Sequence, residues 1–292
     1  MPRIWDMHVH PYFDEAVQGY GIPFSRLAES LQHSRTAHFS GDSSRPISLQ
    51  ETVEHLDQAG AEGGIVVNVD SVRWGSQVSN AGLAERLRSF APKLRFFPSV
   101  DPNRGPAARR ELERSLREDG AIGLKLHPSY QDFFPNDRKL AYPLYEICQA
   151  AGVPVLLHSG TCWLHQVPIE QSRPIHLDQV ALDFPDLRLI LAHGGWPWAD
   201  ELIAVVWRHQ HVYMDLSGNL PRFLPAVIWH YANIGAVGRK MLFGSDYPFI
   251  SPRQWVEAFS AFNEWFYPQE NRVETWREGV KERILGQNFV DL

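Results

Sequence analysis

The stretch LAYPLYEICQAAGVPVLLHSG, residues 140–160, contains the unit from which we predict the whole fold. Residues 140–151 have the spacing of an amphipathic helix, and Gly152 follows where a left-handed helix cap belongs. Residues 153–158 form a short apolar run, typical of a strand buried on both faces, and the run ends in a histidine. A chain that repeats this helix–strand unit predicts an α/β fold built on a parallel sheet.

The same alternation repeats along the chain. The runs rich in Val, Ile, Leu or Phe that we expect to be strands are residues 3–8, 64–70, 94–100, 121–127, 153–158, 187–193, 211–216 and 240–246. The helix-like segments are residues 49–59, 80–90, 106–118, 140–151, 175–184, 198–208, 221–234 and 252–266. Ser48 and Glu51 have the spacing of a capping box at the start of the first helix, and Gly60 stands where that helix should be capped.

Eight strands alternating with eight helices predict one α/β domain over residues 1–292, a single (β/α)8 TIM barrel. Residues 11–45 would be a long loop insertion after the first strand, of the kind that often covers a site. Residues 272–285 would form an extra C-terminal helix.

Composition restricts the partners that we expect. The chain of 292 residues carries a net charge of −6 without a run of Lys or Arg, which argues against nucleic acid, and its apolar runs are shorter than the ~18 residues of a membrane helix. Two cysteines cannot build a disulfide framework, and no signal-peptide pattern begins the sequence, so we expect a cytoplasmic protein. A small-molecule substrate is the expected partner. Aromatic residues near the C-terminus that could supply an apolar patch for a homodimer are Trp255, Trp265, Phe266, Tyr267 and Trp276.

Histidine, with 13 residues, marks the predicted strand ends. Five histidines end a predicted strand or lie just beyond it, namely His8, His10, His127, His158 and His193, and Asp246 ends the eighth strand. The active site of a TIM barrel lies at the carboxyl ends of its strands, so these six side chains should meet there.

Strand geometry places His8 and His10 on one face, because side chains two residues apart point the same way. The same parity directs Asp6 inward, and it directs Trp5, Met7 and Val9 towards the helix layer. Inward polar groups need partners, and a divalent ion would supply them. Imidazole and carboxylate suit Zn²⁺ and similar ions. The candidate metal ligands are His8, His10, His158 and Asp246.

These motifs resemble a known family. The His8-x-His10 pair, the strand-end histidines in PVLLHSG and LILAHGG, and the aspartate in LFGSDYP are similar to those of the amidohydrolase superfamily. The resemblance is greatest to the branch that includes aminocarboxymuconate semialdehyde decarboxylase and aromatic-acid decarboxylases. The terminal ILGQNFVDL is also similar to the Leu-Gly-x-Asn helix of that branch.

The resemblance implies roles for these residues. His8, His10 and His158 would bind a divalent metal, preferably Zn²⁺ with Mn²⁺ or another divalent ion as an alternative. Asp246 would ligate the metal or accept a proton from its water, and His193 would orient or deprotonate that water or polarise the substrate, so both would be catalytic. The expected reaction is hydrolysis of an amide, ester or lactone by metal-activated water. The alternative is a nonoxidative decarboxylation of a small aromatic or unsaturated acid, and a third is a barrel that binds metal without catalysis.

Lys125 has three interpretations. Its parity matches that of His127, so both should face the barrel axis at the fourth strand. Lys125 could be a carboxylated ligand bridging two metals, as in some amidohydrolases, an ammonium group that binds a substrate carboxylate, or the ion-pair partner of an inward carboxylate such as Asp6. We expect a single metal, with Lys125, His127 and Trp196 contacting the substrate.

Overall fold

Eight parallel strands form the centre of the computed structural model, which describes residues 3–13, 16, 45–75, 78–162, 164 and 166–292. In chain order they are β1 (Ile4–Val9), β2 (Ala61–Val67), β3 (Leu94–Phe97), β4 (Leu124–Leu126), β5 (Val155–Leu157), β6 (Leu189–Leu191), β7 (Val212–Asp215) and β8 (Met241–Leu242). Each strand pairs with the next as β1-β2-β3 and as β4-β5-β6-β7-β8. The predicted strands are therefore present, although most are shorter than the apolar runs that predicted them.

Backbone contacts join these two groups of strands at both seams. Lys125 N donates to Pro98 O at 2.8 Å, and Ser99 pairs with Lys125 in a parallel bridge, which connects the end of β3 to β4. Met7 N donates to Phe243 O at 2.9 Å, which connects β1 to the end of β8. The sheet therefore closes on itself, and the predicted (β/α)8 barrel is confirmed.

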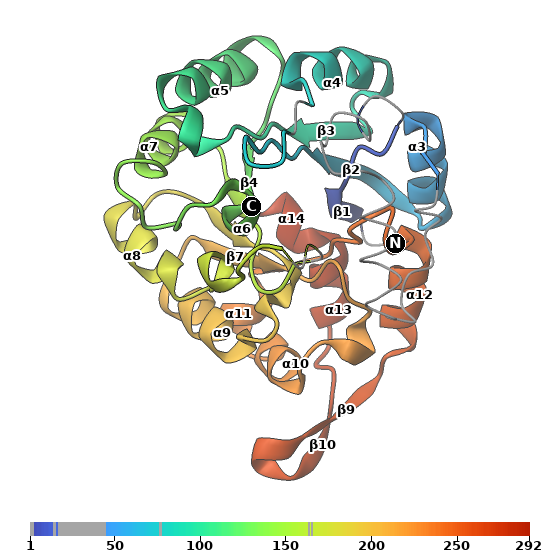
Figure 1. Ribbon diagram of the computed structural model, residues 1–292. Coiled ribbons are helices and arrows are strands. Elements are labelled where there is room, and N and C mark those ends of the chain that lie inside the picture. The colour runs from blue at the N-terminus through green and yellow to red at the C-terminus, as the bar shows by residue number, and fades with distance from the viewer. Residues whose placement is uncertain (1–2, 14–15, 17–44, 76–77, 163, 165) are drawn as a thin grey trace.

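Helices surround this barrel (Figure 1). The α-helices are α3 (Leu49–Gln58), α4 (Asn80–Leu87), α5 (Pro106–Glu118), α6 (Pro128–Gln131), α7 (Tyr142–Ala151), α8 (His176–Asp183), α9 (Ala199–Arg208), α10 (Ala226–Ala232), α11 (Gly235–Gly238), α12 (Pro252–Ala261), α13 (Val280–Glu282) and α14 (Asn288–Val290). Short 3-10 turns are Arg88–Phe90, Pro102–Arg104, Glu170–Ser172, His193–Gly195, Pro221–Phe223 and Pro268–Glu270, and Arg283–Gln287 is a π-helical turn.

Local sequence signals explain where several helices begin and end. The capping box of α3 is present, because Ser48 Oγ accepts from Glu51 N while the Glu51 carboxylate accepts from Ser48 N. Gly60, with φ of +70°, and Gly152, with φ of +65°, take the left-handed conformation expected after α3 and α7.

Alternation along the strands separates two cores. On β5, Leu156 faces a cluster inside the barrel, whereas Val155 and Leu157 pack against the helices. The interior cluster includes Ile65 and Phe97 as well, and no polar side chain of the site belongs to it. This cluster therefore fills part of the interior with apolar side chains, while the buried polar residues Asp6 and Lys125 lie within β1 and β4.

The first strand departs from simple alternation. Val9 packs against the helix layer as predicted, but Met7 belongs to the interior cluster and Trp5 stacks on Phe289 of α14, with ring centroids 4.8 Å apart. The outward orientation predicted for Trp5 and Met7 is therefore wrong. The register of β1 against β2 shifts between Asp6 and Val9, and such an irregularity lets consecutive residues turn towards the same side.

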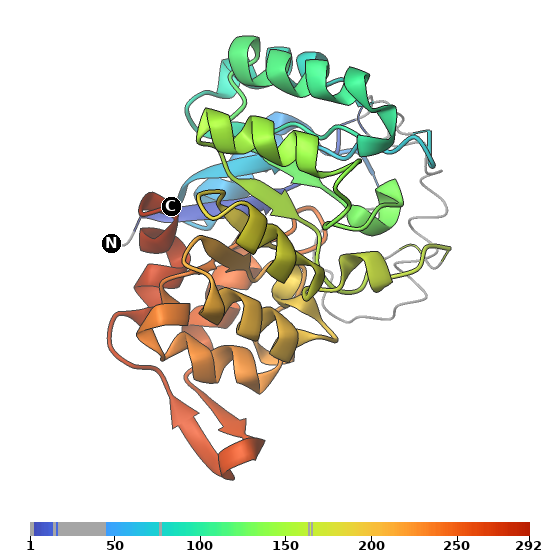
Figure 2. The ribbon, with the colours of Figure 1, turned by 90° about the vertical axis from the view of Figure 1, so that its left-hand side faces the viewer.

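The C-terminal segment differs from the prediction. Residues 264–275 form an antiparallel hairpin of β9 (Glu264–Tyr267) and β10 (Arg272–Thr275), which projects from the barrel (Figures 1 and 2). Helical structure follows at residues 280–290, so the extra C-terminal helix is present but begins later than predicted. In α14, the buried Asn288 donates to Gly238 O and Met241 O at 2.7 Å each, which fastens this end of the chain to β8.

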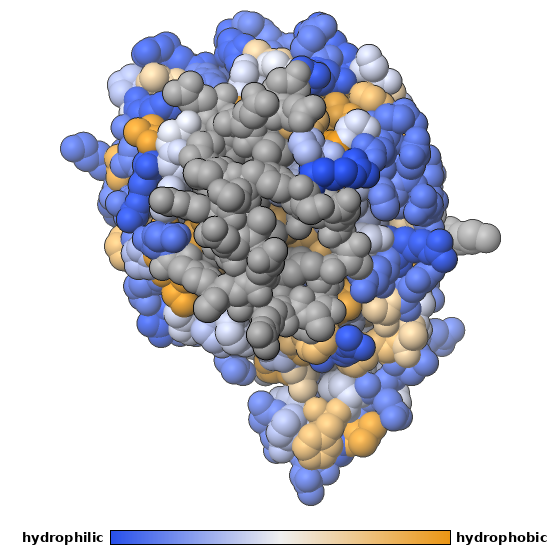
Figure 3. Space-filling model, turned by 45° about the vertical axis from the view of Figure 1, so that its right-hand side comes forward, coloured by the Kyte–Doolittle hydropathy of each residue, from blue (hydrophilic) through white to orange (hydrophobic). Residues whose placement is uncertain are grey.

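The predicted apolar patch is largely buried. Trp255, Trp265 and Tyr267 lie in the core, whereas Phe266 is strongly exposed and pairs with the exposed Val273 across the hairpin. Figure 3 shows apolar surface on the projecting hairpin. The homodimer stays a prediction. Most of the insertion at residues 11–45 lies outside the described residues. None of the helices described is long and apolar enough to cross a membrane.

Candidate metal centre

Three of the predicted metal ligands converge where β8 meets β1. Asp246 Oδ1 lies 3.1 Å from His10 Nε2 and 3.6 Å from His8 Nε2. Their ligand atoms all lie within 4.8 Å of one another. His8 and Asp246 are buried, and His10 is partly open.

The backbone of the β1–β8 seam fixes this geometry. Asp246 N donates to His8 O at 2.9 Å, and His10 N donates to Tyr247 O at 2.8 Å. Beneath them, Asp6 Oδ1 accepts from His8 N at 3.1 Å and from Ser245 N at 2.9 Å. These two hydrogen bonds make Asp6 a connector between the strands, and burial raises its pKa to about 7.

The arrangement fits a divalent cation. Among the described residues, no donor meets the buried Asp246 Oδ1 with hydrogen-bond geometry, so this oxygen needs a partner. Burial lowers the pKa of His8 to about 3, with repulsion from Lys125 adding to the effect, so His8 is neutral and offers a lone pair. Burial alone would raise the pKa of Asp246, but attraction to His193, His10 and His8 holds it below its ordinary value. Two imidazoles and a carboxylate are suitable ligands for Zn²⁺.

A second polar cluster lies on the other side of His8. Asp215 Oδ2 lies 3.0 Å from His8 Nδ1, and Ser217 Oγ lies 2.8 Å from His193 Nδ1. Asp215 Oδ1 accepts from Ser217 N at 2.9 Å and from the Ser217 hydroxyl. Asp215 was not among the predicted site residues, although it ends β7 as Asp246 follows β8, and that position was the available signal.

His158 lies outside both groups of converging ligand atoms. Its ring stacks on His127 with centroids 3.8 Å apart, and His127 stacks in turn on Tyr130 at 3.6 Å. His158 Nε2 lies 2.9 Å from Thr161 O, and its ring centroid is 4.7 Å from that of His193. Its role as a metal ligand stays a prediction, and it would use Nδ1 because Nε2 donates to the carbonyl.

Lys125 is buried beneath the site. Its Nζ lies 3.3 Å from His8 Nε2, and burial lowers its pKa to about 8, against the attraction of Asp215 and Asp246. No ion pair joins Lys125 to Asp6 among the residues described, so Asp6 is not its partner, and the carboxylates that attract Lys125 are Asp215 and Asp246. Contact of Lys125 or His127 with substrate stays a prediction.

A small hollow of about 60 Å³ opens beside these residues. Trp196, which is 53% exposed, lines this hollow, and its contact with substrate stays a prediction. The residues that line the hollow are His158, Ser159, Thr161, Cys162, His193, Trp196, Gly218, Asn219 and Asp246, and none of these is a Lys or Arg.

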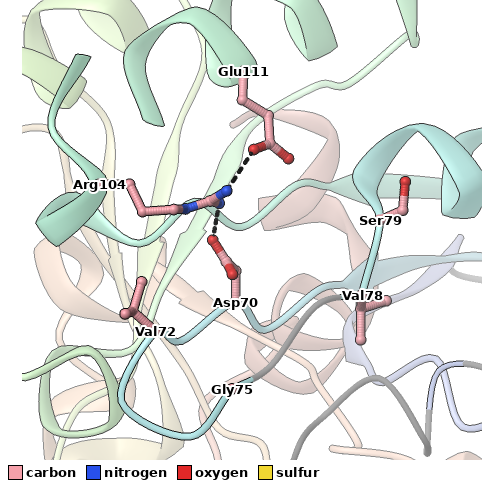
Figure 4. A pocket seen from close by; sticks show the side chains of 7 residues that line it. All are labelled: Asp70, Val72, Gly75, Val78, Ser79, Arg104 and Glu111. Carbon is pink, nitrogen blue, oxygen red and sulfur yellow. Dashed lines mark hydrogen bonds and ion pairs between the residues drawn. The ribbon is translucent and has the colours of Figure 1, made fainter. Parts of the chain in front are cut away.

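A larger pocket, of about 410 Å³, lies beyond the ends of β2 and β3 (Figure 4). Arg104 bridges the carboxylates of Asp70 and Glu111 across its wall. Burial raises the pKa of Asp70 to about 6 despite the nearby guanidinium. Each charged group there already has a partner, which is typical of a structural ion-pair network.

Comparison with known proteins agrees with the fold. An uncharacterised TIM-barrel protein from Bordetella bronchiseptica is 27% identical, with a TM-score of 0.78 over 99% of this chain and 98% of the other. A dihydroxybenzoic acid decarboxylase from Polaromonas, solved with bound manganese, is 19% identical, with a TM-score of 0.68 over 100% of this chain and 96% of the other. A probable 2-pyrone-4,6-dicarboxylic acid hydrolase from Acinetobacter baumannii is 16% identical, with a TM-score of 0.64 over 99% of this chain and 98% of the other.

No protein of curated function matches the sequence. The model of the amidohydrolase family matches residues 5–288, from the first strand to the helix that carries Asn288. The chain therefore belongs to the amidohydrolase family, and it is an enzyme of that superfamily.

Proposed function

We propose that the protein is a metal-dependent hydrolase acting on a small amide, ester or lactone. The observation that carries the proposal is the convergence of His8 Nε2, His10 Nε2 and the unpartnered Asp246 Oδ1 beside a hollow. Zn²⁺ is the preferred ion, and Mn²⁺ is the alternative, since a dihydroxybenzoic acid decarboxylase of the same fold was solved with manganese. Such an ion, when bound, would polarise a carbonyl group and lower the pKa of a water molecule towards about 7.

The protein's own groups would then manage the proton. Asp246 stays ionised at neutral pH because its pKa is lowered, so it can accept a proton from the attacking water. His193 lines the hollow beside Asp246, and its Nδ1 is held by Ser217. Its position suits it to orient or deprotonate the water. Trp196 at the rim would shield the reacting carbonyl from bulk water.

A carboxy-lyase reaction is the second candidate. The decarboxylase from Polaromonas supports it, because it shares this fold over nearly its whole length. The lining of the hollow favours hydrolysis instead, because its described residues include no Lys or Arg that would hold a substrate carboxylate.

A substrate panel tests the two reactions directly. Zn²⁺-loaded and Mn²⁺-loaded protein would be incubated with lactones, p-nitrophenyl acetate, simple N-acyl amides and hydroxylated benzoic acids. Hydrolysis predicts acid release on a pH-stat and one ¹⁸O atom from labelled water in the product. Release of CO2 from the benzoic acids without ¹⁸O incorporation would refute the hydrolase. The matched variants are His8→Ala, which should lose bound metal and turnover, and His211→Ala, which alters a histidine outside the site and should retain both.

A further inference from the structure

We propose that Asp215 and Ser217 set the tautomers of His8 and His193, so that each imidazole carries its proton on Nδ1 and presents an unprotonated Nε2. The two residues are therefore positioning residues for the proposed metal centre, and this inference rests on the proposed function. Neither touches the hollow, because both are fully buried behind the two histidines.

Asp215 can only be an acceptor in this arrangement. Its Oδ1 accepts hydrogen bonds from Ser217 N at 2.9 Å, from His193 N at 3.3 Å and from the Ser217 hydroxyl. Its Oδ2 lies 3.0 Å from His8 Nδ1. Two carboxylate oxygens can accept about four hydrogen bonds, so the contacts use the full capacity of an ionised carboxylate. The fourth contact requires a proton on His8 Nδ1.

Ser217 then determines the second tautomer. A hydroxyl group has one proton to donate, and this proton is directed at Asp215 Oδ1. Ser217 Oγ must therefore accept from His193 Nδ1, which lies 2.8 Å away. It is also 3.2 Å from His8 Nδ1, whose proton can be shared between Oγ and the carboxylate. A neutral imidazole has only one proton, so Nε2 of both rings carries a lone pair. The lone pair of His8 Nε2 can accept from Lys125 Nζ, which lies 3.3 Å away.

The consequence for the site follows from the direction of these lone pairs. His8 Nε2 is the nitrogen that faces Asp246 Oδ1, at 3.6 Å, in the proposed ligand group. With the opposite tautomer, an N–H bond would occupy that position and no cation could be bound. Groups that orient a ligating histidine through its second nitrogen typically affect metal affinity by about 10- to 100-fold.

One other interpretation of the same atoms can be tested. One ligand atom each of His8, His193 and Asp215 lie within 4.8 Å of one another, and such a group could hold a cation itself. The hydroxyl of Ser217 lies at hydrogen-bond distance from all three groups, which favours protons on the nitrogens over a second ion.

The tautomers can be measured in the metal-free protein by long-range ¹H–¹⁵N correlation spectra of ¹⁵N-histidine-labelled samples. We expect Nδ1–H signals for His8 and His193. Asp215→Ala should convert His8 to a mixture of tautomers and weaken Zn²⁺ binding about 10- to 100-fold in a chelator competition. Ser217→Ala should shift the tautomer of His193 and leave Zn²⁺ affinity within threefold. If Asp215→Ala does not fold, Asp215→Asn keeps the shape of the side chain with a weaker acceptor and should show the same changes in smaller degree.

Asp178→Asn is the matched control, because Asp178 Oδ1 lies 2.7 Å from His209 Nε2 outside the site. It should change neither the tautomers of His8 and His193 nor Zn²⁺ affinity. An Nε2–H signal for His8 in the wild type, or two Zn²⁺ ions per chain with one bound at Asp215, would overturn the inference. Unchanged tautomers and affinity in folded Asp215→Ala would also overturn it while the metal centre stands. Failure of the wild type to bind Zn²⁺ would instead refute the proposed function, and the spectra of the metal-free protein would still decide the tautomers.

Discussion

Replacing Gly218 by alanine would place a methyl group against the reacting side chains. Gly218 has φ of +74°, and an added Cβ would lie 2.9 Å from His193 Nδ1 and 3.2 Å from Asp246 Oδ2. The left-handed conformation costs an alanine about 1–2 kcal/mol relative to glycine. Ordinary van der Waals contact begins at 3.4 Å, so the imidazole must also retreat by about half an ångström.

This retreat would stretch the 2.8 Å contact between His193 Nδ1 and Ser217 Oγ. Losing that hydrogen bond adds about 1 kcal/mol, so the total loss of unfolding free energy should be about 2–3 kcal/mol. A misplacement of about 1 Å can cost 10²-fold in rate, and half that displacement should therefore lower kcat/KM about tenfold.

Gly279→Ala provides the matched comparison. Gly279 has φ of +75°, almost the same as Gly218, but nothing lies within 4 Å of an added Cβ. It should therefore lose only the conformational 1–2 kcal/mol and retain full turnover. Urea unfolding would give both free energies, and kcat/KM would be measured on the best substrate of the panel. Equal stability losses in the two variants, with turnover unchanged in Gly218→Ala, would refute the reasoning.

Three further measurements test the fold and the site. An added Cβ at Gly286 would lie 1.3 Å from Arg3 O, so Gly286→Ala should lose about 3 kcal/mol of unfolding free energy and roughly 6–12 °C in Tm. Gly235→Ala is the control and should be nearly neutral, because nothing lies within 4 Å of its added Cβ. Equal Tm values in the two variants would contradict this packing. The pKa of Asp70 is about 6 in the fold against 3.8 in the unfolded chain, so ionisation of Asp70 destabilises the fold. The unfolding free energy of Asp70→Asn relative to the wild type, measured with urea, should therefore grow by about 2–3 kcal/mol as pH rises from 4 to 6 and then level off. A pH-independent difference would argue against this burial. Zn²⁺ at 100 times its Kd should raise the unfolding free energy by about 2.7 kcal/mol, and a chelator should reverse this gain. An equal stabilisation of His10→Ala by Zn²⁺ would exclude the assigned site.

Local patterns predicted most of the architecture. A short apolar run next to an amphipathic helix is a property of neighbouring residues, so eight such pairs could be recognised without knowing how they pack. Helix caps are equally local, and the capping box at Ser48 is present as expected. Strand bounds were less predictable, because β8 keeps only two paired residues, Met241 and Leu242, although the apolar run around it is longer. In the hairpin, Glu264–Tyr267 does alternate in burial, but this signal was too short to compete with the helical pattern before it.

The sequence by itself determined the barrel, the strand-end positions of its histidines and the family, because all of these depend on residue type and spacing. Only the tertiary structure decided which nitrogen of His8 faces the site. Its partners, Lys125 and Asp215, are 117 and 207 residues away in the chain, and strand parity cannot reveal them, since the irregularity in β1 breaks that parity at this point. Closure of the barrel brings β1 against β8 and surrounds His8 with groups from β4 and β7, and the resulting hydrogen bonds, rather than the spacing of His8 and His10, determine how the imidazole can act.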